Sequence, residues 1–360
     1  MLQRIEKILG ICDRHFFARF SVNKSLRHLK LGPPGELLRN NIYQEWVLTD
    51  LIRTENVFPY NFTGSVSGNI SELIEPFTHA KLCTSDHLPF GIAVQTSGVD
   101  VSDSDHKELE CDDNQTILKT YMFLNPENST QYFDEWQQSQ KAWWTKISAC
   151  PGRFTLTDVH SQNSSSQVQI LADFGWGKRV VETICLNTSG MFDSLDLDTR
   201  HIFELKQGRK KIFPDILISS FSLENAVITF LCDAYDESTS MNLSREVMRF
   251  HRKIAPYKAS FSISSSTTST CSDLCELAEF LTKQLRSVGI STLLLPDASK
   301  KSLESQFVRN DEIGIPYTVV MNDSTLKNGI IALRSRDTTL KEQVHITELK
   351  KYMLQLYKNY

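Results

Sequence analysis

The sequence predicts an α+β protein whose last hundred or so residues form a domain of their own. Between residues 255 and 360, strand and helix patterns follow one another in the order strand, helix, strand, helix, strand, strand, helix. This order predicts a mixed sheet with helices packed against it. Residues 1–254 carry strand and helix patterns in a less regular order, and a chain of 360 residues has room for about two to three domains. We therefore expect two domains, 1–254 and 255–360.

The composition excludes several classes of protein. Hydrophobic residues make up 40% of the chain and aromatic residues 10%, which is typical of a folded protein with cores of ordinary size. A net charge of -4 argues against a protein that coats nucleic acid indiscriminately, so any contact with nucleic acid must use a local patch. The eight cysteines are scattered without the paired spacing of a zinc site, and no apolar run is long enough to span a membrane. We expect no metal, no cofactor and no membrane association.

The first thirty residues are basic, with Glu6 and Asp13 as their only acidic residues. The cations are Arg4, Lys7, Arg14, Arg19, Lys24, Arg27 and Lys30. Ile5, Ile8 and Leu9 lie on one face of a predicted helix. The stretch is typical either of an organelle-import presequence or of an ordinary amphipathic first helix.

The stretch from Ile313 to His345 concentrates strand signals and charge. A β-prone run at 317–321 is followed by Asn328-Gly329, a hairpin turn signal, and by a second run at 330–333. Arg334 and Arg336 then lie at the mouth of a strand, and Asp337-Thr338-Thr339 is typical of a helix start. These residues predict either a surface that grips a partner or an anion, or a capped loop.

Two further runs are rich in cations. Lys206, Arg209, Lys210 and Lys211 precede a predicted strand at 212–218, and Arg245, Arg249, Arg252 and Lys253 lead into the last domain. The spacing of Arg245, Arg249 and Arg252 would place them on one face of a helix. Each run is consistent with phosphate contacts or with a solvated turn.

Three other segments carry possible chemistry. Gly175 and Gly177 precede an apolar run at 180–186, which predicts a helix behind a phosphate cradle, although close backbone packing explains the glycines equally well. Residues 227–231 predict a short buried strand. Seven acids between 100 and 113 could hold a divalent ion, but they are more typical of a solvated loop.

Several of these motifs resemble known families. Residues 311–317, 326–329 and 334–339 resemble the anticodon-binding domain of class IIa aminoacyl-tRNA synthetases, and residues 32–40 resemble the first class II motif in its glycyl-tRNA synthetase form. The chain is still more similar to the accessory subunits of mitochondrial DNA polymerase gamma. The matching residues are 57–59, 88–91, 143–144, 174–178, 182–183, 333–339, 341–342 and 345–346.

The resemblance implies a class II synthetase-like antiparallel sheet with helices in 1–254 and a mixed five-stranded sheet in 255–360. It also implies no catalysis. A working class II synthetase needs an arginine in its second motif to hold the ATP α-phosphate, because negative charge builds up there. Residues 92–99 contain no Arg-x-Glu pattern, and Arg179, which could imitate the third-motif arginine, would be half a site.

The resemblance further implies a mitochondrial location, in the matrix and nucleoid, and a role in DNA replication. The expected partner is the catalytic polymerase subunit, docked on a rim that carries Leu333, Arg334, Arg336, Asp337 and His345. The two basic runs would contact double-stranded or primer-template DNA. Residues 61–87 are too short and polar for a dimerising helical bundle, so we expect a monomer that pairs one-to-one. A residual synthetase-like enzyme and an RNA-binding module are the alternatives.

Overall fold

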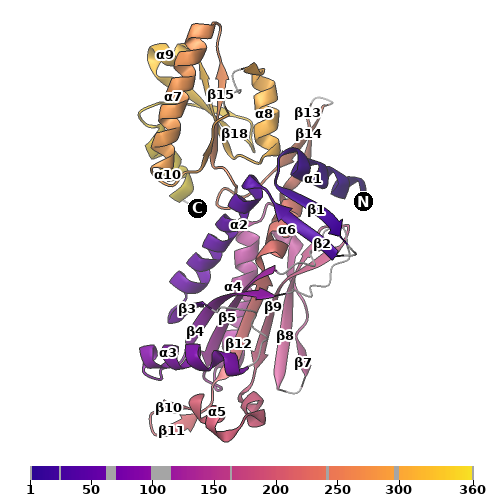
Figure 1. Cartoon of the computed structure of the whole chain (residues 1–360), viewed down its shortest axis with the longest axis vertical. Coiled ribbons are helices and arrows are strands. Elements are labelled where there is room, and N and C mark those ends of the chain that lie inside the picture. Colours follow the sequence, from indigo (N-terminus) through magenta and orange to yellow (C-terminus); the bar gives the residue numbers. More distant parts are fainter. Residues whose placement is uncertain are drawn as a thin grey trace.

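The computed structural model describes residues 2–23, 26–61, 70–98, 115–162, 164–240, 243–295 and 300–358. The chain forms an elongated molecule with two bodies stacked along its long axis (Figure 1). The lower body is built on a sheet of eight strands, and the upper body on a sheet of five. The acidic segment 100–113 lies outside the described residues.

The larger sheet runs β3-β4-β5-β12-β9-β8-β6, with β7 paired to β8 beside β6. All neighbours are antiparallel except β3 and β4, which are parallel. This arrangement confirms the predicted antiparallel core. The strands are β3 (Val57–Asn61), β4 (Phe90–Gly98), β5 (Gln115–Leu124), β6 (Phe154–Leu156), β7 (His160–Gln162), β8 (Ser165–Asp173), β9 (Lys178–Asn187) and β12 (Asp215–Ser222).

Both faces of this sheet are covered, and β5 shows how the sequence directs each side chain to one face. Met122 and Leu124 belong to one hydrophobic core, whereas Tyr121 and Phe123 belong to another, as the period of two in a strand requires. The first core includes residues of α2 (Pro33–Trp46), α4 (Ser129–Ile147) and α6 (Leu223–Ala234). The second includes residues of α3 (Ile74–Thr84) and its neighbours, close to α5 (Leu197–Ile202).

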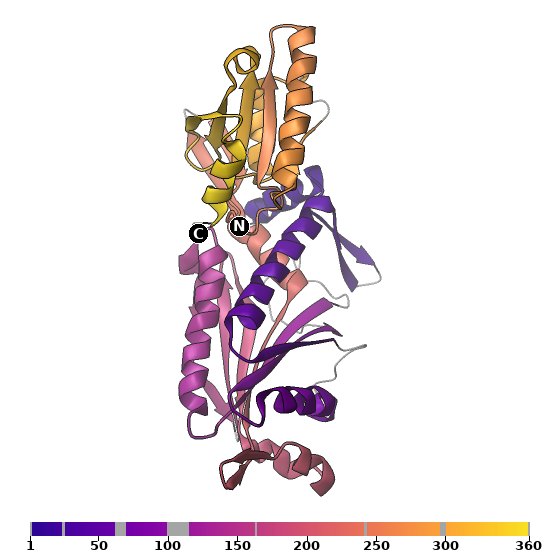
Figure 2. The same ribbon diagram turned by 90° about the vertical axis from the view of Figure 1, so that its left-hand side faces the viewer.

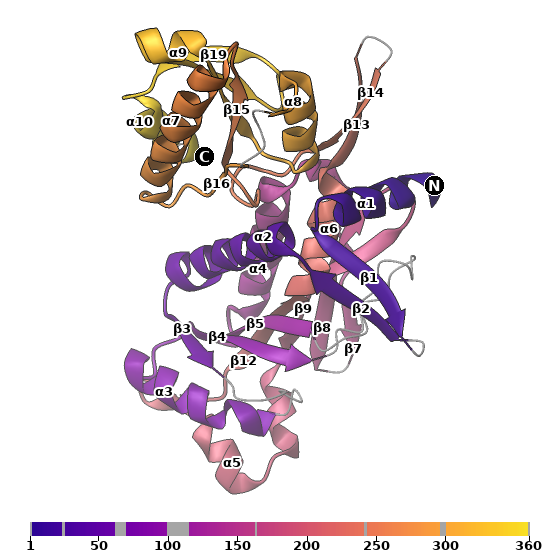
Figure 3. The same ribbon diagram turned by 45° about the horizontal axis from the view of Figure 1, so that its top comes forward.

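Smaller elements lie at the two ends of this body (Figures 1 and 2). At its end nearer the second domain lie α1 (Leu2–Arg14) and the hairpin of β1 (Ala18–Asn23) and β2 (Leu26–Leu31). At its far end is a hairpin of β10 (Leu205–Gln207) and β11 (Lys210–Ile212). A ribbon of β13 (Tyr235–Ser240) and β14 (Leu243–Met248) rises from the end of α6 and passes beside the second domain (Figure 3).

The second domain has the strand order β16-β15-β17-β18-β19, with β16, β15 and β17 parallel and the last two antiparallel. The predicted mixed five-stranded sheet is confirmed, and it has a hydrophobic core of its own. Its elements are β15 (Ala259–Ser264), α7 (Thr268–Arg286), β16 (Thr292–Leu293), α8 (Leu303–Glu312), β17 (Tyr317–Asn322), α9 (Asp323–Asn328), β18 (Ile330–Ser335), β19 (Lys341–His345) and α10 (Leu349–Lys358).

Two local predictions in the first body are wrong. The run at 180–186, expected as a helix, lies within strand β9, between β8 and β12. The run at 227–231, expected as a strand, lies within helix α6, whose first turn is capped by the Ser222 hydroxyl accepting from the Asn225 amide. Eleven of the twelve α6 residues are buried, and a helix that is buried all round shows no polar face in its sequence.

Three further predictions are also wrong, two in the second body and one in the segment that leads into it. Asn328-Gly329 does not form a two-residue hairpin turn, because Asn328 ends α9 and Gly329 caps it in the left-handed conformation, at φ 69°. Asp337-Thr338-Thr339 forms a turn into β19 instead of starting a helix. Finally, Arg245 lies on strand β14, and the residues that follow it as far as Lys253 are not helical.

Candidate functional site

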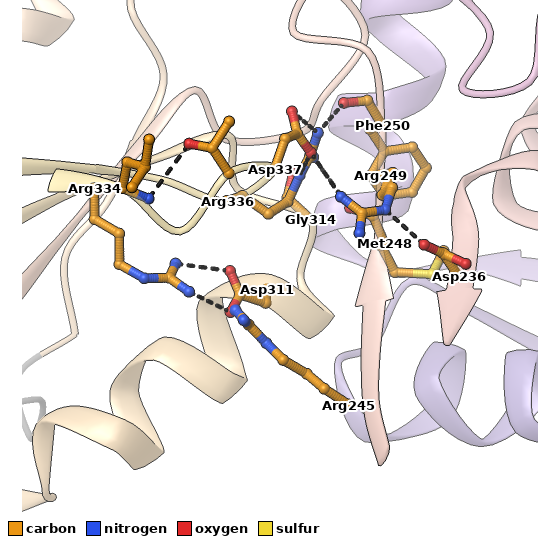
Figure 4. Close-up of polar contacts among 12 residues, drawn as sticks. Asp236, Arg245, Met248, Arg249, Phe250, Asp311, Gly314, Arg334, Arg336 and Asp337 are labelled. Carbon is orange, nitrogen blue, oxygen red and sulfur yellow. Dashed lines mark hydrogen bonds and ion pairs between the residues drawn. The ribbon is translucent and has the colours of Figure 1, made fainter. Parts of the chain in front are cut away.

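The seam between the two bodies holds a cluster of arginines and carboxylates (Figure 4). Asp311, on α8, is completely buried, and Arg334 of β18 donates to both of its carboxylate oxygens at 3.0 and 3.1 Å. Arg245 of β14 forms a second ion pair with the same carboxylate. The Arg334 guanidinium also lies 4.6 Å from the ring centre of Phe307. A buried carboxylate needs such partners, because an unpaired charge in the interior is costly.

Arg336 holds the backbone that connects the two bodies. Its guanidinium donates to the carbonyls of Met248, Phe250 and Gly314 at 3.1, 2.9 and 2.9 Å. Its other two bonds, at 2.9 and 3.1 Å, go to the carboxylate of Asp337. These five contacts use all five N–H donors of the side chain. Because two of the carbonyls lie at the end of β14 and just beyond it, Arg336 ties the second domain to the end of the first.

Arg249 extends this cluster at the surface. Its Nε donates to Asp236 at 2.7 Å and its Nη1 to Asp337 at 3.3 Å (Figure 4). Partial burial alone would raise the pKa of Asp337, but the charges of Arg336 and Arg249 lower it below its ordinary value. Asp337 therefore bridges two arginines as a carboxylate and still faces solvent on one side.

These contacts correct the expectation of an exposed arginine rim. Leu333, Arg334 and Arg336 are only 3, 3 and 5% exposed, so their side chains cannot reach a partner at the surface. Of the five residues predicted for partner binding, Asp337 and His345 are exposed. The sequence shows the two arginines, but it does not show that Asp311 is buried and that Arg334 forms its ion pair in the interior.

The cations of the second basic run also pair with groups of the same chain. Arg252 donates to the carbonyl of Leu356 on α10 at 2.9 Å, and the Lys253 ammonium lies 3.5 Å from Glu45. Together with the ion pairs of Arg245 and Arg249, these contacts use every cation of the run within the protein. DNA that bound here would have to compete with those partners, although a role in DNA binding stays a prediction.

The first basic run is placed differently, on the β10–β11 hairpin. Lys206, Arg209, Lys210 and Lys211 are all exposed, with Gly208 at the tip in the left-handed conformation, at φ 63°. Lys211 pairs with Glu204 at 2.9 Å, whereas the other three cations have no ion pair with any described residue. The hairpin lies at the end of the molecule opposite the second domain (Figure 1).

The positions proposed for synthetase chemistry are filled by internal contacts. Arg179 is only 5% exposed and donates to the Asn225 side chain at 2.6 Å, so it does not present its charge to a bound phosphate. Phe174 and Trp176 are stacked and largely buried, so the turn that they frame carries no open cradle. Gly175 has φ 75°, and a Cβ at this position would meet no atom within 4 Å. Backbone conformation, and not close packing, therefore favours glycine there.

Two carboxylates that the sequence does not single out are buried in the first body. Glu182 accepts hydrogen bonds from the Trp144 indole and the Ser219 hydroxyl, and burial raises its pKa to about 8 despite them. Asp50 accepts from Thr120 at 2.8 Å and Gln140 at 3.1 Å, and burial raises its pKa to about 6. Glu182 lies within the apolar run at 180–186, which was the available signal of its burial, whereas Asp50 lies in a stretch that mixes apolar and polar residues. Among the described residues, no group of three or more His, Cys, Asp or Glu side chains could hold a metal ion.

Comparison with known proteins gives consistent relatives. Residues 262–356 match the family described as "Anticodon binding domain". The chain is 25% identical to DNA polymerase subunit gamma-2 of Bos taurus in an alignment 417 positions long, which covers 97% of this chain and 84% of that protein. It is 28% identical to DNA polymerase subunit gamma-2, mitochondrial, of Xenopus laevis over 247 residues, which cover 67% of this chain and about half, 52%, of that protein.

A second group of relatives consists of enzymes. The chain is 24% identical over 251 residues to a protein of Bacillus anthracis named glycine–tRNA ligase, covering 66% of this chain and 51% of that protein. No helix in the described parts of the chain is both long and apolar enough to cross a membrane.

Proposed function

We propose that this chain, a homologue of the DNA polymerase gamma-2 subunits with an anticodon-binding domain at its C-terminal end, is a non-catalytic accessory subunit of a mitochondrial DNA polymerase. It binds the catalytic subunit and raises processivity and primer-template affinity in the mitochondrial matrix and nucleoid. The observation that carries the proposal is a similarity to the bovine gamma-2 subunit over 97% of this chain.

The interior contacts of Arg179 support a role without chemistry. A synthetase must stabilise the charge on the ATP α-phosphate, and Arg179 is instead bonded to Asn225 in the interior. Strand β4, from Phe90 to Gly98, offers no arginine to replace it. Because the glycine–tRNA ligase relatives are enzymes by name, the competing function is a residual synthetase. Amino-acid-dependent exchange of pyrophosphate into ATP distinguishes the two, and clear turnover would exclude the accessory role as stated.

The partner surface is assigned to the second domain. Of its exposed candidates, Asp337 precedes strand β19 and His345 is the last residue of that strand. The buried Arg334 and Arg336 act on this surface indirectly, by fixing the domain that carries it. Polar and charged groups of this kind are typical of an interface rim.

The DNA-contacting surface is assigned to the β10–β11 hairpin. Lys206, Arg209 and Lys210 combine exposure with the absence of an ion pair among described residues, so their charges are available to phosphates. The hairpin and the second domain lie at opposite ends of the molecule (Figure 1). One chain can therefore contact the polymerase at one end and duplex DNA at the other.

We further propose a monomer that pairs one-to-one with the catalytic subunit. The bovine alignment extends over 417 residues although this chain has 360, so the bovine protein contains segments with no counterpart here. In the described part of the connection from β3 to β4, the α-helix is α3, whose Phe77 and Ala80 are already buried in the second core. Light scattering on the isolated chain tests this point, and a stable dimer mass would contradict it.

The deciding experiment is primer extension by the catalytic subunit with and without this chain. We expect longer products per binding event and tighter primer-template binding when the chain is present. If the chain neither binds the polymerase nor changes product length, the accessory role is wrong. A parallel titration with structured RNA and duplex DNA tests the RNA-binding alternative, which predicts a preference for the RNA.

A further inference from the structure

Strand β19 is the outer strand of the five-stranded sheet. It pairs with β18 on one side, and it ends the strand order on the other. An edge strand presents unpaired backbone N–H and C=O groups, which can pair with an extended segment of another chain. Its residues Lys341, Glu342, Gln343 and His345 are exposed, so no described part of the chain covers this edge.

The hydrogen bonds that flank β19 show which backbone groups point outward. Just after β19, the Ile346 amide donates to the Gly329 carbonyl. Just before β19, the Leu340 carbonyl accepts from the Ser335 amide. In an antiparallel pair, residues that exchange backbone bonds alternate with residues that do not. With the register Leu333↔Glu342 and Ile331↔Val344, Glu342 and Val344 bond to β18. The backbone groups of Lys341, Gln343 and His345 therefore point away from β18. The His345 carbonyl already accepts from the Glu348 amide at 2.9 Å, so the amides of all three residues and the carbonyls of Lys341 and Gln343 are the groups offered to an added strand.

A hollow of about 370 Å³ lies beside this edge, between β19 and α10. Residues 342–345 line it from the strand, Gln355 lines it from the helix, and Glu348 lines it from the position just before the helix. Tyr352 also lines it and donates its hydroxyl to the Glu342 carboxylate. The volume is sufficient for a side chain of an added strand, and its lining offers hydrogen-bonding groups from both elements.

We propose that an extended segment of the catalytic polymerase subunit adds a strand to β19, with alternate side chains directed into the hollow beside α10. This inference rests on the proposed function and specifies how its partner surface is used. The exposed Asp337 and His345 then lie at the two ends of the docking edge, and the edge itself supplies affinity through backbone bonds.

The features of β19 favour an added strand from a partner over pairing between two copies. The strand has only five residues, and charged side chains at Lys341 and Glu342 oppose indiscriminate edge-to-edge association. A partner segment can complement those charges, whereas a second copy brings the same ones. Pairing between copies is the contrary outcome of the test, because it would appear as a dimer in light scattering.

The test compares Gln343→Pro with Gln343→Ala in complexes of the full chain with the catalytic subunit. Proline removes an outward N–H and blocks the edge without removing a bond to β18, whereas alanine removes only the side chain. We expect Gln343→Pro to weaken binding on the order of tenfold or more, and Gln343→Ala to bind within about twofold of the unmodified chain. Thermal unfolding of both variants checks that the domain is intact.

Amide hydrogen exchange gives a second, independent readout. In the free chain, the amides of Glu342 and Val344 should exchange slowly and those of Lys341, Gln343 and His345 quickly. On adding the catalytic subunit, the three fast amides should become protected. Equal binding by both variants, or unchanged exchange in a complex that does form, would overturn the proposal of strand addition and leave the proposed function standing. Failure of the unmodified chain to bind at all would instead overturn the proposed function.

Discussion

Arg334 and Asp311 form a buried bidentate ion pair, with donor–acceptor distances of 3.0 and 3.1 Å. This pair joins β18 to α8 at the seam between the two bodies. Arg245 reaches the same carboxylate from the other body. One carboxylate thus forms ion pairs with two guanidinium groups that come from different domains.

We expect Asp311→Ala to destabilise the protein by about 3–5 kcal/mol, because it leaves two partly or fully buried guanidinium groups without their carboxylate. Urea unfolding measures this loss. The control is Asp13→Ala, which removes an ion pair with Arg19 whose two side chains are each 67% exposed, and it should leave the midpoint unchanged. A similar midpoint for both variants would show that Asp311 is dispensable.

Replacement of Gly314 by alanine should be far more damaging than replacement of Gly289. Both glycines have positive φ, 77° and 80°, so both variants incur the same kind of backbone strain. A Cβ on Gly314 would lie 2.4 Å from the Phe250 ring and 2.8 Å from the Met248 carbonyl, whereas a Cβ on Gly289 meets no atom within 4 Å. The difference between their unfolding free energies therefore reports the contact between the domains. Equal losses would mean that this contact relaxes easily.

Glu182 should make the stability of the protein fall as the pH rises. Its folded pKa of about 8 lies above the ordinary value of 4.5, so between these values the folded state holds a proton that the unfolded state has released. Stability therefore declines from about pH 4.5 to about pH 8. Glu182→Gln keeps a neutral side chain that can still accept a hydrogen bond from Trp144. Its free energy of unfolding should therefore rise relative to that of the unmodified protein as the pH increases across this range. Urea unfolding at pH 5, 6.5 and 8 tests the sign, and a constant difference would contradict it.

Neutralising the β10–β11 hairpin should reduce the salt dependence of DNA binding. The triple variant Lys206→Gln, Arg209→Gln, Lys210→Gln removes three cations, which corresponds to a decrease of about 2 to 3 in the slope of log K against log salt. The matched control removes three exposed lysines of the second domain, Lys283, Lys301 and Lys327. It carries the same net charge and should keep the original slope. Identical slopes for both triple variants would exclude the hairpin as the contact.

The sequence predicted much of the second domain because its segments carry strong local signals. The run at 317–321 and the run at 330–333 are both strands, β17 and β18, and the α7 helix follows the spacing of Leu274, Ala278, Leu281 and Leu285. What failed there were the connections between the strands, because residues 337–339 form a turn and Asn328-Gly329 is compatible with a hairpin turn and with a helix end. Local sequence does not distinguish those two uses of a left-handed glycine.

Burial is the cause of two failures in the first body and of the error about the arginine rim. Residues 180–186 and 227–231 are both apolar runs, and only the neighbouring elements decide that the first is a strand and the second a helix. The candidate site failed in the same way. From sequence alone, an arginine is expected at the surface. Arg334 is buried because it pairs with Asp311, which lies 23 positions earlier in the chain and is buried too.

The contacts of Arg336 with the carbonyls of Met248 and Phe250 have a consequence for how two copies of this chain can associate. Exchange of the second domain between two copies needs a connecting segment that can open and extend. Here Arg336 holds that segment from one side, and the C-terminal helix holds it from the other, through Arg252 to Leu356 and through the Tyr357 hydroxyl to the Lys258 carbonyl. Domain swapping would have to break all of these bonds at once, so the seam keeps each second domain on its own chain.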